Sequence, residues 1–160
     1  DNPVMFIEHK MLYKGKDVVP EEDYIIPFGV ADVKREGKDV TFISYSRMVL
    51  RGLEAAEELA KEGIDVEVID LRTLKPLDMD TIVKSVRKTG RVVLATEAYK
   101  NTSFINEVMV RINEEAFDWL DAPMVRVAAA DVPVPRAEAL EDEAIPNVGK
   151  LIEACREVMS

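Results

Sequence analysis

The chain has 160 residues, 48% hydrophobic and 32% charged, the composition of a globular domain with a core of its own. Its formal net charge of −10 argues against non-specific binding to nucleic acid or to an anionic membrane. A single cysteine, Cys155, excludes a disulfide within the chain, and no run of residues is long enough to span a membrane. We expect a protein of the cytoplasm, or of the mitochondrial matrix if the source is a eukaryote. Because the first residue is Asp1, we also expect a fragment of a longer protein.

The first 30 residues do not have the pattern of the beginning of a domain. Residues 4–7 are an apolar run without alternation, typical of a strand buried on both faces, and a polar stretch with the composition of a linker follows. We interpret residues 1–30 as the last strand of a missing domain plus a linker, and residues 31–160 as a complete domain. The alternative is that residues 4–7 pack as an edge strand or arm on that domain. His9 is expected to be a surface or interface residue.

Strands and helices alternate in the centre of the chain. Residues 40–45, 66–69 and 92–95 are short β-rich runs, and the segments between them carry apolar residues at helical spacing. Ser46 and Asp78 are the expected N-caps of the two intervening helices. This alternation predicts right-handed crossovers and a parallel sheet.

The flanking segments complete the predicted fold. Residues 31–35 and the strand that begins at Val40 predict a β-hairpin, which adds an antiparallel edge strand. Apolar residues between Ile105 and Trp119 predict a third helix, and residues 124–127 predict a fourth parallel strand. We therefore expect a three-layer α/β/α domain with a mostly parallel sheet of about five strands.

A long acidic connection leads to the last helix. Pro133 and Pro135 cannot lie in a central strand, because proline donates no ladder hydrogen bond. We expect at most one helical turn at residues 137–140, and then a helix capped by Asn147 that buries Cys155.

Few residues suggest chemistry. No glycine-rich nucleotide motif follows the first parallel strand. The tips of parallel strands are the usual ligand crevice, so Glu97 and Arg72 are the best-placed polar groups, although capping or pairing roles are more common for such residues. His9 and Cys155 make neither a metal site nor a nucleophilic pair. We expect no catalytic, cofactor-binding or metal-binding residue.

Several motifs, in order, resemble the E1 β subunits of 2-oxo-acid dehydrogenase complexes. Residues 2–10 read N-P-V-M-F-I-E-H-K and residues 70–78 read D-L-R-T-L-K-P-L-D. Residues 120–123 read L-D-A-P, and residues 130–135 read A-D-V-P-V-P. The resemblance runs along essentially the whole chain. Pyruvate, branched-chain 2-oxo-acid and acetoin dehydrogenases share these motifs, and transketolases share the domain more distantly.

This resemblance implies a fold, a reaction and a set of partners. The fold is that of the transketolase C-terminal domain. The parent enzyme uses thiamine diphosphate and Mg²⁺ to decarboxylate pyruvate or a related 2-oxo acid, and it passes the acyl group to lipoyl-E2. The cofactor-activating glutamate and the magnesium motif belong to other segments, so the fragment is expected to be inactive and to bind neither cofactor. The implied partners are the E1 α subunit, a second E1 β subunit and the E2 subunit-binding domain, with Asp121 and Ser160 as candidate E2 contacts.

One turn departs from the family pattern. The family commonly has T-G-G-F-G-x-E after the third strand, whereas residues 101–107 keep only Phe104 and Glu107 of it. We therefore expect a divergent member and leave the substrate open. Two alternative functions also stay open: a stand-alone interaction module that uses the acidic proline loop, and a small-molecule-binding protein with its site near Arg72 and Glu97.

Overall fold

The computed structural model describes residues 2–16 and 18–160, and a five-stranded sheet forms its centre. The strands are β1 (Asp32–Arg35), β2 (Val40–Ser44), β3 (Val66–Asp70), β4 (Val92–Tyr99) and β5 (Val125–Ala129). Their order in the sheet is β1-β3-β2-β4-β5, and only the β1–β3 pairing is antiparallel. The prediction of a mostly parallel sheet with an antiparallel edge strand is confirmed.

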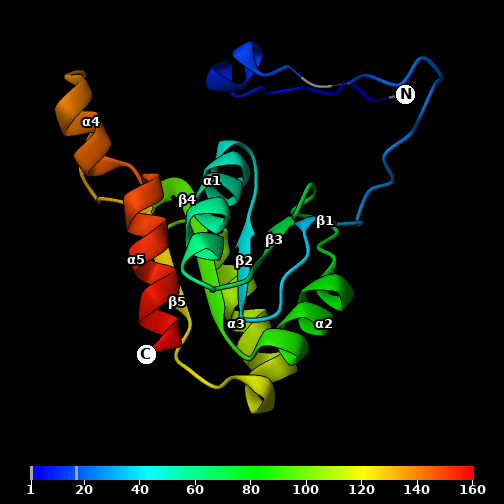
Figure 1. The fold of residues 1–160 in the computed structure, drawn as a ribbon. Coiled ribbons are helices and arrows are strands. Elements are labelled where there is room, and N and C mark those ends of the chain that lie inside the picture. The colour runs from blue at the N-terminus through cyan, green and yellow to red at the C-terminus, as the bar shows by residue number, and fades with distance from the viewer. Residues whose placement is uncertain (1, 17) are drawn as a thin grey trace.

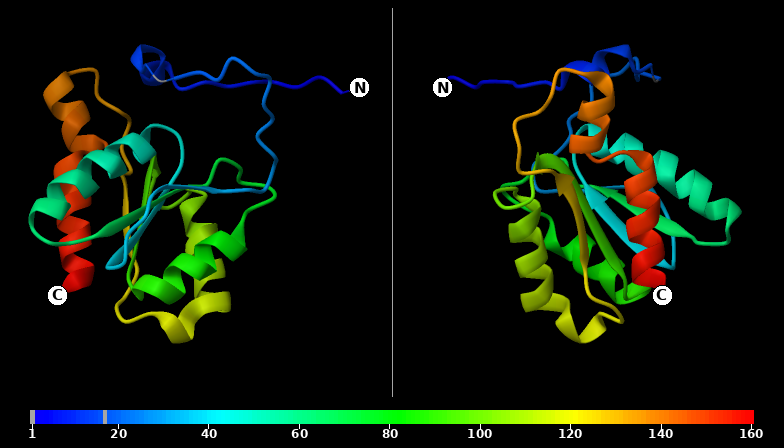
Figure 2. Two further views of the ribbon diagram at one scale, coloured as in Figure 1. Left: turned by 45° about the vertical axis from the view of Figure 1, so that its right-hand side comes forward. Right: turned by 90° about the vertical axis from the view of Figure 1, so that its left-hand side faces the viewer.

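Helices cover both faces of this sheet (Figures 1 and 2). One face carries α1 (Arg47–Lys61) and α5 (Val148–Met159), and the other carries α2 (Met79–Thr89) and α3 (Ile105–Ala116). Successive strand residues point to opposite faces, so Phe42 belongs to the core under α1 and α5, whereas Ile43 belongs to the core under α2 and α3. A Cβ on Gly52 would overlap the Phe42 ring, so α1 packs closely on β2. The three-layer prediction is confirmed.

Local signals set the helix ends. Asp78 caps α2 by accepting a hydrogen bond from the backbone amide of Thr81 at 3.1 Å. Asn147 caps α5 in the same way, with the amide of Lys150 at 3.0 Å. Ser46 occupies the predicted cap position of α1, but its side chain makes no capping hydrogen bond. Two of the three predicted caps therefore have the expected contact.

The predicted hairpin between residues 31–35 and the strand at Val40 is wrong. Strand β1 pairs with β3, because β3 and β4 already occupy both edges of β2. The connection passes beneath the start of β3, where the amides of Lys38 and Asp39 donate to the carbonyl of Asp65. A Cβ on Gly37 would overlap the β3 backbone, so glycine permits this close crossing.

The C-terminal third follows the prediction with two differences. Helix α3 ends at Ala116 and a 3₁₀ turn, η2 (Phe117–Trp119), follows it. Trp119 is half exposed, with the Arg87 guanidinium 5.3 Å from its ring centre. The acidic connection forms no strand, as predicted, but its helical part is a full helix, α4 (Glu138–Ala144), rather than one turn.

The N-terminal arm, defined as residues 2–16 and 18–28, lies outside the sheet. It contains one 3₁₀ turn, η1 (Lys10–Lys14), and Figure 1 shows it running across the carboxyl ends of the parallel strands. Residues 4–7 form no strand, and each of these apolar side chains is at least 85% exposed. These residues are therefore no edge strand of the domain, whereas the alternative of an arm on the domain stays a prediction. The division at residue 30 stays a prediction. In the described part of the chain, no helix combines the length and apolarity needed to cross a bilayer.

Candidate functional site

The carboxyl ends of β2 and β4 form the switch point of the sheet. The chain leaves β2 for β3 on one side and later returns to β4 on the other. In parallel α/β sheets this divergence opens the usual ligand crevice. Arg47 begins the helix after β2, and Glu97 lies near the end of β4. The predicted polar group Glu97 is therefore at the expected place.

The Glu97 carboxylate is shared between two partners. Its Oε1 accepts a hydrogen bond from Arg47 Nη1 at 3.0 Å, and its Oε2 lies 2.9 Å from Nε2 of His9 in the arm. The His9 Nδ1 accepts from the amide of Met11 at 3.2 Å, which places the ring proton of the neutral tautomer on Nε2. The acid at the strand tips is thus engaged by the protein itself.

Ser46 has a backbone outlier at the same edge. Its φ of 56° and ψ of −141° lie in a region that costs a residue with a side chain about 1–3 kcal/mol. A strained serine between a strand and a helix is also the geometry of a nucleophile elbow. However, the Nε2 and Nδ1 of His9 are bonded to Glu97 and Met11. The described chain therefore forms no serine–histidine pair here.

Arg72 lies apart from Glu97. It follows β3 with a φ of 53°, and its Nη2 bonds Asp32 Oδ2 of β1 at 2.6 Å. Strand β2 separates β3 from β4, so the two predicted polar groups sit on different strands and have different partners. Arg72, which follows β3 by two positions, thus bonds the edge strand β1.

The loop after β3 fastens the beginning of the domain, which sequence reasoning missed. The Gly29 amide donates to Thr73 Oγ1 at 2.9 Å, and the Ala31 amide donates to Asp78 Oδ2 at 2.8 Å. Gly29 has a φ of 77°, and a Cβ there would lie 2.8 Å from the Pro76 ring. The specificity of the D-L-R-T-L-K-P-L-D run was the available signal, because Thr73, Pro76 and Asp78 all belong to it.

The candidate E2 contacts lie at the opposite end of the domain. The Asp121 amide donates to the carbonyl of Gly90 at 2.7 Å, just before β4 begins. Its side chain is 65% exposed and lies 3.8 Å from Arg91. Ser160 follows α5, whose end is marked C in Figure 2 on the side of the amino ends of the strands. The two candidates therefore share one end of the molecule.

The sequence matches the family described as the transketolase C-terminal domain over residues 29–151. The chain belongs to this family. It is 47% identical over 160 residues to the pyruvate dehydrogenase E1 component subunit beta of Bacillus subtilis, covering 99% of this chain and 49% of that protein. It is 45% identical over 159 residues to the acetoin:2,6-dichlorophenolindophenol oxidoreductase subunit beta of Cupriavidus necator, covering 99% and 47%.

A solved structure agrees with these relatives. A split gene transketolase, described as an inactive beta4 tetramer, superposes with a TM-score of 0.77 at 32% identity, over 91% of this chain and 47% of that one. This chain thus spans about half the length of each of these three proteins. The resemblance drawn from the motifs is confirmed. The roles of Asp121, Ser160, Arg72 and Glu97 stay predictions.

The side chains that the structure describes do not match the donor set that thiamine diphosphate and Mg²⁺ need. Among residues 2–16 and 18–160, no group of three or more His, Cys, Asp or Glu side chains could hold a metal. The one buried side-chain polar atom without a partner in these ranges is Ser103 Oγ, a neutral hydroxyl. Burial raises the pKa of the Cys155 thiol to about 12, so it is not a nucleophile at neutral pH.

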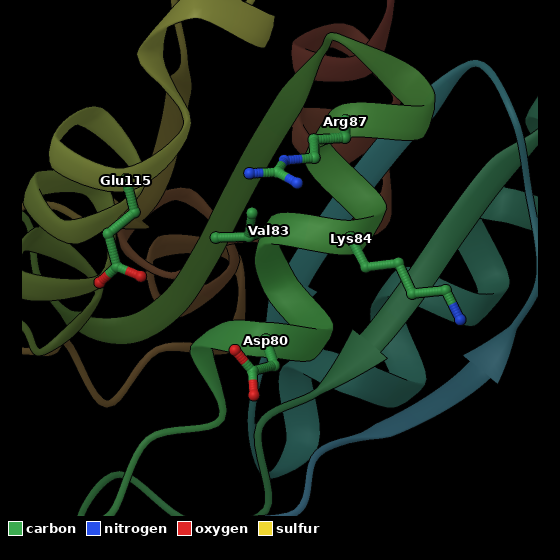
Figure 3. Close-up of a pocket in the computed structure, with 5 residues that line it drawn as sticks. All are labelled: Asp80, Val83, Lys84, Arg87 and Glu115. Atoms are coloured by element: carbon green, nitrogen blue, oxygen red, sulfur yellow. The ribbon is translucent and has the colours of Figure 1, made fainter.

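The hollow between α2 and α3 is also a poor match for the cofactor. It measures about 390 Å³ and is lined by Asp80, Val83, Lys84, Arg87 and Glu115. Figure 3 shows Lys84 turned away from Glu115 and Arg87. Arg87 stacks on Trp119, and Glu115 is paired with Arg111 of its own helix. The charged groups therefore do not converge on a common ligand position.

Proposed function

We propose that this chain is the C-terminal, assembly and partner-binding part of the E1 β subunit of a 2-oxo-acid dehydrogenase. The parent enzyme decarboxylates pyruvate or a related 2-oxo acid with thiamine diphosphate and Mg²⁺, and it transfers the acyl group to lipoyl-E2. The partners are the E1 α subunit, a second E1 β subunit and the E2 subunit-binding domain. The complex works in the cytoplasm, or in the mitochondrial matrix of a eukaryote.

One observation carries this proposal. The identity to E1 β proteins extends over 99% of the chain and so includes the arm, which lies outside the residues matched to the domain family. The arm exposes residues 4–7 to solvent, and apolar surface of this kind marks an interaction site. The remaining half of an E1 β subunit is the natural partner for it.

The reactive groups of the parent enzyme then belong to segments outside this chain. The strand-tip acid Glu97 is held by Arg47 and His9, and Asp78 caps α2. Calorimetric titration of the chain with thiamine diphosphate in MgCl₂ is expected to give no binding heat. A magnesium-dependent micromolar affinity would refute the assignment.

The E2 contact is proposed at Asp121 and Ser160. An exposed carboxylate on a protein of net charge −10 suits a small basic docking domain. With the E2 subunit-binding domain immobilised, Asp121→Asn is expected to weaken binding about tenfold, a loss of about 1.4 kcal/mol. Removal of Ser160 is expected to weaken it as well.

Asp118→Asn is the matched control, because it removes the same charge from an exposed residue of η2. Equal weakening by both substitutions would mean that net charge, and not Asp121, drives the contact. No binding by the unaltered chain would refute the E2 contact itself.

The two alternative functions are not adopted. A small-molecule site near Arg72 and Glu97 is disfavoured, because these groups lie on different strands and are paired with Asp32 and with Arg47 and His9. The stand-alone interaction module predicts binding through the acidic proline loop, residues 131–146, without any E2 contact at Asp121. The Asp121 experiment therefore separates it from the proposed function.

A further inference from the structure

The arm is fastened to the domain at two places. Directly after its last residue, the amides of Gly29 and Ala31 donate to Thr73 and Asp78 beyond β3. Near its beginning, His9 is bound by Glu97 of β4. Strand β2 lies between β3 and β4, so the two points of attachment lie on either side of the switch point. The arm therefore spans the crevice in which a ligand is expected.

The contact at Glu97 is built from partly shielded groups. The side chains of His9, Glu97 and Arg47 are 28%, 21% and 20% exposed. A carboxylate that accepts from a ring N–H and from a guanidinium makes charge-assisted hydrogen bonds, which are stronger than neutral ones. Because Arg47 belongs to the first turn of α1, Glu97 links β4, α1 and the arm.

A hollow beside this contact has the next turn of the arm as one of its walls. Met11 of η1, which is 58% exposed, lines it together with Arg47 and Arg51 of α1. The rest of the lining is Glu138, Glu141 and Asp142 of α4 and Ile145 and Pro146 beyond it. The arm and the domain thus border one largely charged hollow next to the Glu97 contact. In contrast, the apolar residues 4–7 point to solvent. The arm has one side toward the domain and another free for a different partner.

We propose that Glu97 is a positioning residue, and that the occupant of the strand-tip crevice is the turn around His9 and Met11 rather than a small molecule. By holding this turn, Glu97 fixes the course of the arm and the side on which residues 4–7 are presented. This inference deepens the proposed function. It rests on that function only where the other half of E1 β is named as the binding partner of residues 4–7.

The test measures the arm in the chain itself. In hydrogen exchange followed by mass spectrometry, Glu97→Gln and His9→Ala are expected to speed exchange at residues 8–14 by up to about fivefold. Trypsin cleavage at Lys10 and Lys14 is expected to rise by the same factor. Exchange in β2 and β4 is expected to stay unchanged.

Two variants control for general loosening. Tyr13→Phe removes only the arm's own hydrogen bond from Tyr13 to Glu8, and Glu107→Gln removes an exposed carboxylate elsewhere. Neither is expected to expose residues 8–14 as Glu97→Gln does. His9→Gln is expected to restore protection in part, because its side-chain amide can donate from nearly the position of Nε2.

The proposal is overturned if residues 8–14 of the unaltered chain exchange as fast as an unstructured peptide. It is also overturned if Glu97→Gln leaves their exchange unchanged. Both results are independent of thiamine diphosphate and E2, so they are separable from a failure of the proposed function.

Discussion

Two glutamates at opposite ends of the sheet show how the same side chain serves different purposes. Glu67 of β3 has a side chain only 3% exposed, and it binds Lys88 of α2 and the amide of Gly37. Glu97 of β4 is more exposed and binds the arm. Glu67 joins elements within the domain, whereas Glu97 joins the domain to the arm. The two ends of the sheet can therefore be told apart by whether their acid binds within the domain or binds the arm.

The largest effect is expected from breaking the Glu67 contact. Glu67→Ala leaves Lys88 without its buried partner and the Gly37 amide without an acceptor, at a cost of about 3 kcal/mol in the free energy of unfolding. Urea denaturation followed by circular dichroism measures it. Glu36→Gln removes the other, 80% exposed partner of Lys88 and should cost far less. A similar loss in both variants would contradict the importance of burial.

The pKa of Lys88 gives this contact a pH dependence. Burial alone lowers that pKa, but hydrogen bonds to Glu67 and Glu36, together with their charges, outweigh it and raise the pKa above its ordinary value. A raised pKa in the folded state means stability that is complete below about pH 10 and is lost at more alkaline pH. The stability advantage over Lys88→Met should therefore shrink above about pH 10.4. An advantage that is constant up to pH 12 would argue against the ion pair.

Asp78 joins the beginning of α2 to the residue before β1, and its removal should have an intermediate effect. It caps α2 and holds the Ala31 amide, so Asp78→Ala is expected to cost about 1–2 kcal/mol. Burial raises its pKa, but bonds from the amides of Ala31 and Thr81 and from the Thr81 hydroxyl outweigh this and lower it. A lowered pKa means stability that is present above about pH 4 and lost as the pH falls further.

Urea titrations of the unaltered chain and of Asp78→Ala at neutral and acid pH measure this contribution. The difference between them should shrink below about pH 4. Asp80→Ala, in the first turn of the same helix, is the control and should show a smaller difference. A difference that grows in acid would contradict the assignment.

The smallest effect on stability is expected at Glu97. Glu97→Gln should change the free energy of unfolding by less than about 1 kcal/mol, because a partly exposed ion pair contributes little. The same urea titration measures it. Loss of stability as large as in Glu67→Ala would mean that Glu97 supports the core and would erase the contrast between the two acids.

The sequence was informative where neighbours in the chain decide the structure. Alternating strands and helices predicted four parallel strands, and Asp78 and Asn147 were found from local capping rules. The hairpin was wrong because the partner of β1 depends on a crossing beneath β3, 30 residues away from Gly37. Pairing between distant segments leaves no local signal.

The candidate site divides in the same way. Glu97 was recognised from its position at a strand tip, but its partner His9 lies 88 residues earlier and could be named only as a surface or interface residue. Glu67 was missed, because a glutamate within a β-rich run has the pattern of an exposed position. Only the packing of α2 over β3 buries it.

The stacking of Arg87 on Trp119 provides a built-in optical reporter. Trp119 is the only tryptophan of the chain, it is half exposed, and it lies two residues before Asp121. Its indole emission depends on solvent and on the cation above its ring. Docking at the Asp121 end should therefore shift the fluorescence spectrum, whereas release of the arm at the other end should leave the spectrum unchanged. A label-free spectrum can thus distinguish which end of the molecule has been engaged.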